Sequence, residues 1–404
     1  MGDLVRASFP NAHGPSLSDA VSPGRGWHRD RRLWWLLWSR CPGLGWRRLL
    51  ALEAGCGGLA AAWAAPAAQL ATVPGVGDGL VERLDRYRRL WGPRPLQAFA
   101  RHSGFGRGVL VPGDPGWPAS LLELQRPPLQ LCWQGRGSLW PHLGRRGSVA
   151  VVGTRRPSLH GLSMARTIGG ALAAAGWPVL SGLAEGIDGA AHEGCLAAGG
   201  APIGILGTPL TRVYPRHHAV LQGQVGRQGL LVSELAEGTA VRGGCFAARN
   251  RLLVALAAAV VVVECPAASG ALHSAELAWQ QGLPLWTVPA DAARASGLGS
   301  NRLLARGATP LLLPEDLIDQ LGAGPLAGAV PRVRPASSAA AGPAGAGASA
   351  PEAEALLRAV GGGASLEQLS QTLGRSAEEL LPQLLDLELA GRLHAEAGLC
   401  WRPR

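Results

Sequence analysis

Residues 148–161 read SVAVVGTRRPSLHG, and this stretch decides the fold class. Its continuous run of small apolar residues is typical of a parallel strand that is buried on both faces. The run ends at Gly153, and a loop with two arginines then leads into a segment of helical character. A helix in that place directs its free N–H groups and the positive end of its dipole at the loop. The stretch therefore predicts an anion-binding strand–loop–helix unit.

The loop differs from the two common nucleotide-binding signatures. Gly153 and Gly161 are eight residues apart, no G-x-G-x-x-G lies between them, and the G-K-[ST] ending of a P-loop is missing. Thr154, Arg155 and Arg156 follow Gly153 instead. Because arginine offers a planar fork for phosphate oxygens, the loop suits a bound polyanion. A surface turn with two solvated arginines is the alternative.

A second unit of the same kind follows. Residues 178–180, PVL, enter the loop SGLAEGID at residues 181–188, and a helix-like run begins after it. Loops that follow neighbouring parallel strands lie at one edge of the sheet, where open α/β folds bind ligands. Asp188 suits the N-cap of the following helix. His192 has no metal-like partner spacing, so we expect it to pack against the core.

A third group of residues combines an aromatic ring with cations. Phe246 and the run Arg249-Asn250-Arg251 precede a twelve-residue apolar stretch at 252–263, which is too short for a membrane span and predicts another buried strand in its second part. A ring can stack on any base while guanidinium groups hold phosphates, which suits single-stranded nucleic acid. Alternatively, Phe246 lies in the core and the arginines pair elsewhere; for Phe246 alone, this second interpretation is favoured.

Strand-like segments recur along the chain near residues 149, 179, 203, 230, 260, 285 and 310, with helix-like segments between them. This alternation predicts an α/β fold whose core is an extended Rossmann-like, largely parallel sheet.

A series of collinear segments between residues 148 and 321 resembles the core of the DNA-processing protein A (DprA/Smf) family. The segments are VAVVGTRRPSLHG, SGLAEGIDGAAH, GILGTPLTRVYP, LLVSELAEGT, FAARNRLL, VVVVECPAASGALHSAELA and TVPADAARASGLGSNRLLARGATPLL. The resemblance implies a cytoplasmic, homodimeric Rossmann-like protein that binds single-stranded DNA. It also implies that the protein protects incoming DNA and helps load the RecA recombinase during natural transformation in competent cells, without catalysis or a cofactor.

The resemblance assigns the binding residues to four places in this sequence. The family's phosphate-binding turn falls on Gly153, Thr154 and Arg155, and its second glycine loop falls on Ser181, Gly182 and Gly186. Its aromatic and R-N-R element falls on Phe246, Arg249, Asn250 and Arg251, and its Ser-Gly turn falls on Ser269 and Gly270.

The sequence departs from the family pattern at several positions. Thr211 stands where Asp is common in the family, and Ala290 stands where the family has the glycine of V-P-G. Gly243, Gly244 and Cys245 occupy positions that are often basic or histidine. Losing one phosphate contact there predicts a salt dependence that is shallower by about one unit of slope.

The composition agrees with an anionic partner. The chain has 38 Lys+Arg against 28 Asp+Glu, a formal charge of +10, and no lysine, so every one of these cations is arginine. Polyanion binding explains the excess, and coding bias is the alternative. The seven cysteines are scattered without a C-x-x-C pair, which predicts small buried residues in a reducing cytoplasm rather than a metal site.

Composition shifts predict six regions. They are a disordered extension without an apolar signal core at 1–30, a helical domain of the SAM or helix-hairpin-helix kind at 31–91, a connector at 92–147, the Rossmann-like domain at 148–321, a flexible linker at 322–350 and a winged-helix-like domain at 351–404. In the last region, Ser376 and Glu379 form a capping-box start. Acidic residues on that helix favour protein interaction over DNA reading: Glu378, Glu379, Asp386 and Glu388.

The sequence leaves an enzyme as the alternative function. Lysine-decarboxylase-like phosphoribohydrolases of nucleoside monophosphates also use glycine turns, an arginine and a glutamate, and Glu264 keeps this possibility open. Those enzymes carry P-G-G-x-G-T-x-x-E, however, and residues 265–272 lack its double glycine. A winged-helix transcription factor is a third class, which the acidic helix disfavours.

Overall fold

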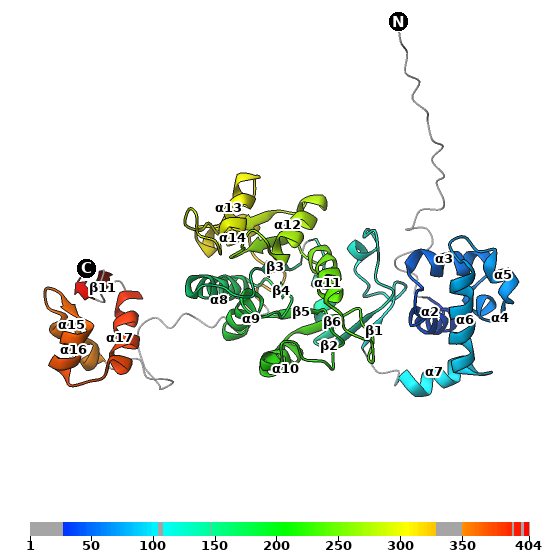
Figure 1. Ribbon diagram of the computed structural model, residues 1–404, viewed down its shortest axis with the longest axis horizontal. Helices are drawn as coiled ribbons and strands as arrows, with labels where there is room; N and C mark the ends of the chain where they lie inside the picture. Colours follow the sequence, from blue (N-terminus) through cyan, green and yellow to red (C-terminus); the bar gives the residue numbers. More distant parts are fainter. Residues whose placement is uncertain are drawn as a thin grey trace, which may run out of the picture. The chain divides into compact units, whose positions relative to one another are not determined.

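The computed structural model describes residues 27–103, 108–145, 147–328, 350–389, 392–396 and 400–403 (Figure 1). The chain divides into two compact units, Met1–Val333 and Arg334–Arg404. The predicted extension lies outside the described residues as far as residue 26, and the predicted linker does so from residue 329 to 349. Among the described residues, no helix has both the length and the apolar character needed to cross a membrane.

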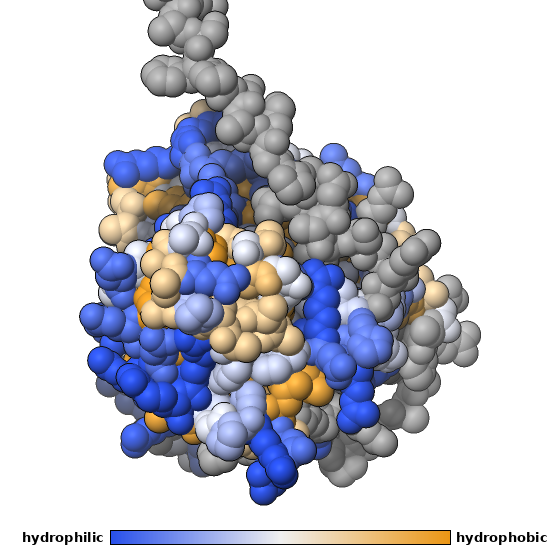
Figure 2. Space-filling view, turned by 90° about the vertical axis from the view of Figure 1, so that its right-hand side faces the viewer, coloured by the Kyte–Doolittle hydropathy of each residue, from blue (hydrophilic) through white to orange (hydrophobic). Residues whose placement is uncertain are grey.

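A tryptophan-rich helical bundle begins the first unit. Its helices are α2 (Arg29–Ser39), α3 (Trp46–Gly55), α4 (Leu59–Ala64), α5 (Ala67–Ala71), α6 (Asp78–Trp91) and α7 (Pro95–Ser103). Trp35 and Trp38 are fully buried, and the rings of Trp35 and Trp46 meet edge to face with centroids 5.4 Å apart. Apolar side chains at helical spacing thus form a core within the bundle. On the surface seen in Figure 2, hydrophilic side chains surround an apolar area.

The segment after the bundle adds an antiparallel edge to the main sheet. Strand β1 (Val109–Leu110) pairs with β2 (Leu131–Gly135), and β2 pairs with β6 (Leu230–Ser233). The same segment holds the bundle in place, because Arg32 Nε donates to Asp114 Oδ1 at 2.9 Å and Trp35 Nε1 donates to the Leu129 carbonyl at 2.7 Å.

The main sheet has nine strands in the order β1-β2-β6-β5-β4-β3-β7-β8-β9. From β6 to β9 the neighbouring strands are parallel. The remaining bounds are β3 (Val149–Val152), β4 (Val179–Ser181), β5 (Pro202–Leu206), β7 (Ala259–Val262), β8 (Leu285–Thr287) and β9 (Thr309–Pro310). These strands confirm the seven predicted strand positions and the mostly parallel α/β class.

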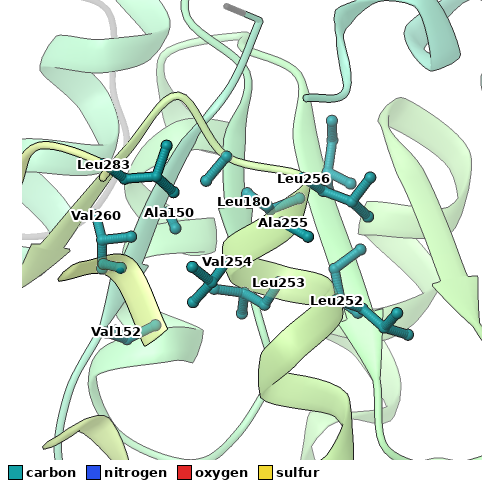
Figure 3. Close-up of a cluster of buried hydrophobic side chains, with 14 of the residues drawn as sticks. Ala150, Val152, Leu180, Leu252, Leu253, Val254, Ala255, Leu256, Val260 and Leu283 are labelled. Atoms are coloured by element: carbon teal, nitrogen blue, oxygen red, sulfur yellow. The ribbon is translucent and has the colours of Figure 1, made fainter. Parts of the chain in front are cut away.

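Helices cover both faces of the sheet, and strand alternation explains why β3 is apolar throughout. Ala150 and Val152 pack with Leu252 of α11 and Ala275 of α12 (Figure 3). Val149 and Val151 point the other way, toward α8, α9 and α14. The helices are α8 (Leu159–Ala174), α9 (Ile187–Ala197), α10 (Ala219–Gln228), α11 (Gly243–Ala255), α12 (Gly270–Gln280), α13 (Leu298–Ala305) and α14 (Pro314–Leu321).

The second unit combines three helices with a small antiparallel sheet. Its elements are α15 (Ala350–Val360), β10 (Ala364–Ser365), α16 (Leu366–Leu373), α17 (Ala377–Leu389), β11 (Leu393–Glu396) and β12 (Cys400–Pro403), with strand order β10-β12-β11. The predicted capping box is confirmed, because the Ser376 amide donates to Glu379 Oε2 at 3.2 Å and the Glu379 amide donates to Ser376 Oγ at 3.3 Å. The winged-helix assignment stays a prediction.

Candidate nucleic-acid interface

A pocket of about 730 Å³ opens at the carboxyl ends of the central strands. Strand β3 lies between β4 and β7, so the loops after β3 and β7 diverge and leave a crevice at this topological switch point. Eight of the twelve predicted binding residues line the pocket. They are Gly153, Thr154, Arg155, Phe246, Arg249, Asn250, Ser269 and Gly270.

The loop after β3 is held by its neighbours on both sides. The Thr154 amide donates to the Glu264 carbonyl at 2.7 Å, and the Thr154 carbonyl accepts from the Ile187 amide at 3.2 Å. A Cβ at Gly153 would lie 2.6 Å from Cγ1 of Ile187, so only glycine fits this contact. The Thr154 hydroxyl accepts from the Arg156 amide at 3.2 Å. The loop is therefore rigid at its base, and Arg155 extends from it as an exposed side chain.

The second glycine loop reaches the pocket through Ala184 and Asp188, whereas its three predicted binding residues do not line the pocket. Ser181 Oγ donates to the Val151 carbonyl at 2.6 Å. Gly186 has φ +85°, and a Cβ there would lie 2.4 Å from the Thr154 carbonyl oxygen. Ser181, Gly182 and Gly186 thus support the glycine loops from behind, and the structure does not place them in the pocket lining.

The N-cap prediction for Asp188 is wrong. Helix α9 begins at Ile187, its N-cap is Gly186, and no side chain caps it. The buried Asp188 carboxylate instead accepts from the Gly182 amide at 3.0 Å, which closes the glycine loop on itself. Burial raises the pKa of Asp188, and the nearby Arg249 guanidinium opposes that rise.

Arg249 supplies a buried cation to the pocket. Its side chain is only 5% exposed, Nη1 donates to the Ile205 carbonyl, and Nε is buried without a partner among the described residues. Burial lowers the pKa of Arg249, whereas the charge of Asp188 raises it. Because Arg249 lines the pocket wall, its positive charge favours an anionic ligand there.

An aromatic pair stands beside the arginines. The half-buried Phe246 ring lies 4.8 Å from the ring centroid of Tyr214, which is 43% exposed. The guanidinium carbon of Arg155 lies 5.6 Å from the Phe246 centroid. Sequence patterns did not indicate Tyr214, because only the fold brings residue 214 next to residue 246; the sole signal was the aromatic residue within GILGTPLTRVYP.

Helix α12 begins at the pocket, whereas the start of α8 does not line it. Ser269 caps α12, with Oγ accepting from the Ala271 amide at 3.2 Å, and the first turn of this helix contains no acidic residue. Ser158 caps α8 by accepting from the Gly161 amide at 3.0 Å. The N-terminal dipole of α12 adds to the positive potential of the pocket. His273, on α12, also lines the pocket, and the sequence analysis had not selected it.

Comparison with known proteins agrees with this geometry. The model of the DNA recombination-mediator protein A family matches residues 108–322, more than half of the 404 residues. The chain belongs to this family. Protein Smf of Synechocystis is 35% identical over 297 residues and covers 74% of each chain. Protein Smf of Escherichia coli is 32% identical over 296 residues, with 72% of this chain and 76% of its own length covered.

A solved structure of DNA processing protein A from Streptococcus pneumoniae shows the same fold. The Streptococcus pneumoniae protein superposes with a TM-score of 0.60 at 24% identity, covering 72% of this chain and 98% of that one. The Helicobacter pylori protein, studied for its single-stranded DNA binding mode, is 31% identical, with a TM-score of 0.47 and coverage of 51% and 92%.

The structure accommodates one departure of this DprA/Smf chain from the family pattern. Ala290 exchanges two hydrogen bonds with Asn301, both of 3.0 Å. A Cβ at Gly297 would lie 2.1 Å from Cβ of Ala290, so the glycine leaves room for the alanine. Gly243 and Gly244 are exposed, and a Cβ at either position would meet open space.

Glu264 braces the start of α8 in this family member. Its Oε2 accepts from the Ser158 amide at 2.9 Å and from Ser158 Oγ at 2.8 Å. Burial raises the pKa of Glu264, but hydrogen bonds from Ser296 and Ser158 outweigh that effect, and the pKa is lowered overall. His192 is fully buried with Nε2 3.2 Å from the Ile203 carbonyl, which confirms its packing role. The described residues contain no group of three or more His, Cys, Asp or Glu that could hold a metal ion.

Proposed function

We propose that the protein binds single-stranded DNA in the pocket at the switch point, without catalysing a reaction. The observation that carries this proposal is the placing of Arg155 and Arg249 in the lining of one pocket with Phe246, whose ring pairs with Tyr214. Cations that neutralise phosphates and rings that stack on bases are the two components of strand binding without sequence readout. In duplex DNA the bases are stacked inside the helix, so they are not available to stack on these aromatic rings.

Fluorescence anisotropy of a labelled oligonucleotide tests this function. The measurement compares single-stranded with duplex DNA over a salt series. We expect a clear preference for the single strand and an affinity that falls as salt rises. Equal binding of both forms, or no binding of either, would contradict the proposal.

We propose further that the protein acts in the cytoplasm as a homodimer, protects incoming DNA and passes its strand to the RecA recombinase during natural transformation. Membership in a family of recombination mediators supports this role. Sedimentation equilibrium tests the dimer. RecA filament formation on strands covered by single-strand-binding protein tests the loading, which we expect to accelerate when this protein is added.

The phosphoribohydrolase alternative has less support. The amide and the hydroxyl of Ser158 both donate hydrogen bonds to Oε2 of Glu264, so this carboxylate has a structural role. Residues 265–272 also lack the double glycine of such enzymes. An assay for free base released from nucleoside monophosphates checks the point, and we expect no product.

A further inference from the structure

A second charged pocket, of about 770 Å³, lies where the helical bundle meets the antiparallel edge of the sheet. Its walls come from the start of α3, residues 125–130, the loop after β6 and helix α11. Four arginines line it, against a single carboxylate: Arg47, Arg48, Arg126 and Arg251, with Glu234. This excess of positive charge points to an anionic ligand.

The start of α3 contributes backbone donors to this pocket. Helix α3 has ten residues, its N-cap Gly45 provides no side-chain cap, and its first turn contains no acidic residue. The first N–H groups of such a helix lack an intrahelical acceptor and favour an anion. Trp46 in this turn is only 5% exposed, and its indole Nε1 is buried without a partner among the described residues. The uncapped start of α3 therefore places free backbone N–H groups in the lining of this pocket.

Arg251 adds a guanidinium group with one nitrogen paired and one unpaired among the described residues. Its Nη2 donates to Glu234 Oε2 at 2.6 Å, whereas Nη1 is buried without a partner in the described part of the chain. Arg48 is held by bonds to two carbonyls, from Nε to Gly75 at 3.0 Å and from Nη1 to Gly43 at 2.9 Å. These contacts fix two of the cations before any ligand arrives, which lowers the entropic cost of binding.

Helix α11 joins this pocket to the first one. Arg249 lines the first pocket and Arg251 the second, and two residues correspond to about 200° around an α-helix. The Arg249 and Arg251 side chains therefore leave this helix on different sides. Ala247 and Ala248 are exposed on this helix, so the surface between the pockets carries neither a long side chain nor a carboxylate there.

We propose that the second pocket binds the phosphate backbone of the same DNA strand where it extends beyond the first pocket. This inference rests on the proposed function. Backbone N–H groups and guanidinium groups suit phosphate oxygens. An acidic peptide offers carboxylates to the same donors, but the shared helix α11 favours a continuous strand. The pocket between bundle and sheet then lengthens the binding site and raises the affinity for long strands only.

The test compares two lengths of labelled oligothymidine, about six and about thirty nucleotides, in the full-length protein. The variant carries Arg47→Ala and Arg126→Ala, two exposed residues of the second pocket. The matched control carries Arg86→Ala and Arg89→Ala, two exposed residues of α6 that line neither pocket, so that it loses the same charge. Circular dichroism establishes that both variants are folded.

For the long strand we expect the pocket variant to bind about tenfold more weakly and to lose about 1.4 units of salt slope, because each single-strand phosphate contact contributes about 0.7. Its affinity for the short strand should equal that of wild type, and the α6 control should change neither. Unchanged affinity for the long strand overturns the proposal and leaves the pocket for an acidic protein segment. An equal loss for both lengths also overturns it. Wild type that fails to bind even the short strand contradicts the proposed function itself.

Discussion

The guanidinium of Arg249 occupies the space that a side chain at Gly182 would need. A Cβ at Gly182 would lie 1.9 Å from Nη1 and 2.4 Å from the guanidinium carbon. Gly182 also donates its amide to Asp188, the carboxylate that opposes the lowering of the pKa of Arg249 by burial. The second glycine loop thus contributes to the pocket indirectly, by positioning the buried cation.

Gly182→Ala should therefore displace Arg249. We expect a loss of about 1–3 kcal/mol in the free energy of unfolding, as for overpacked cores, together with weaker strand binding. Chemical denaturation and anisotropy measure the two effects. Gly79→Ala in α6, where a Cβ meets open space, is the matched control and should leave binding unchanged. Wild-type affinity in Gly182→Ala would contradict the positioning role.

Arg155→Ala removes an exposed cation of the first loop without touching the core. Strand binding should weaken by about 1–3 kcal/mol, the range for a charge-assisted hydrogen bond, while the melting temperature stays near that of wild type. Anisotropy and thermal denaturation measure both quantities. Full affinity in a folded variant would remove this loop from the binding site.

Phe246→Ala and Tyr214→Ala probe the aromatic pair. Each should reduce the affinity for an oligonucleotide by about 1–3 kcal/mol, yet leave the salt slope unchanged because stacking releases no counterions. An abasic strand of equal length is the control substrate, and its affinity should hardly respond. If binding of the abasic strand fell equally, the rings would have a structural role only.

Gly243→Arg should restore a cation where the family is often basic. The position lies three residues before Phe246 on α11, and a Cβ there meets open space. Residues three apart share a helix face, so the new side chain stands beside the pocket. We expect tighter strand binding and a salt slope that is steeper by about 0.7. A slope equal to that of wild type would argue against a phosphate near this helix start.

Acid should destabilise the protein through His192. Burial lowers the pKa of His192 to about 4, whereas the unfolded chain titrates near its ordinary value of about 6.5. The unfolded state therefore binds more protons between these values, and stability falls as the pH drops, by about 1.4 kcal/mol per pH unit. His192→Gln removes this titration and retains an N–H group for the Ile203 carbonyl. The difference between the unfolding free energies of the two proteins should narrow toward pH 4; a constant difference would contradict the assignment.

The sequence by itself determined the periodic elements of this protein. The apolar run before Gly153, and its counterparts along the chain, predicted the six buried strands from β3 to β8 because a doubly buried strand has to be apolar on both faces, whereas the seventh predicted strand, β9, is exposed. Glycine turns marked where each loop begins, and the collinear segments indicated the family.

Only the tertiary structure decided which of these residues meet. Local sequence patterns do not predict contacts between distant segments. These contacts arise when the strands assemble into one sheet with β3 between β4 and β7. This assembly brings Tyr214 to Phe246 and makes Asp188, which was predicted to cap a helix, a hydrogen-bond partner of Gly182. It also adds the antiparallel edge of β1 and β2. Helix α11 itself turns Arg249 and Arg251 to different sides, and the tertiary structure decides what surrounds each of them, so that one R-N-R run reaches two pockets.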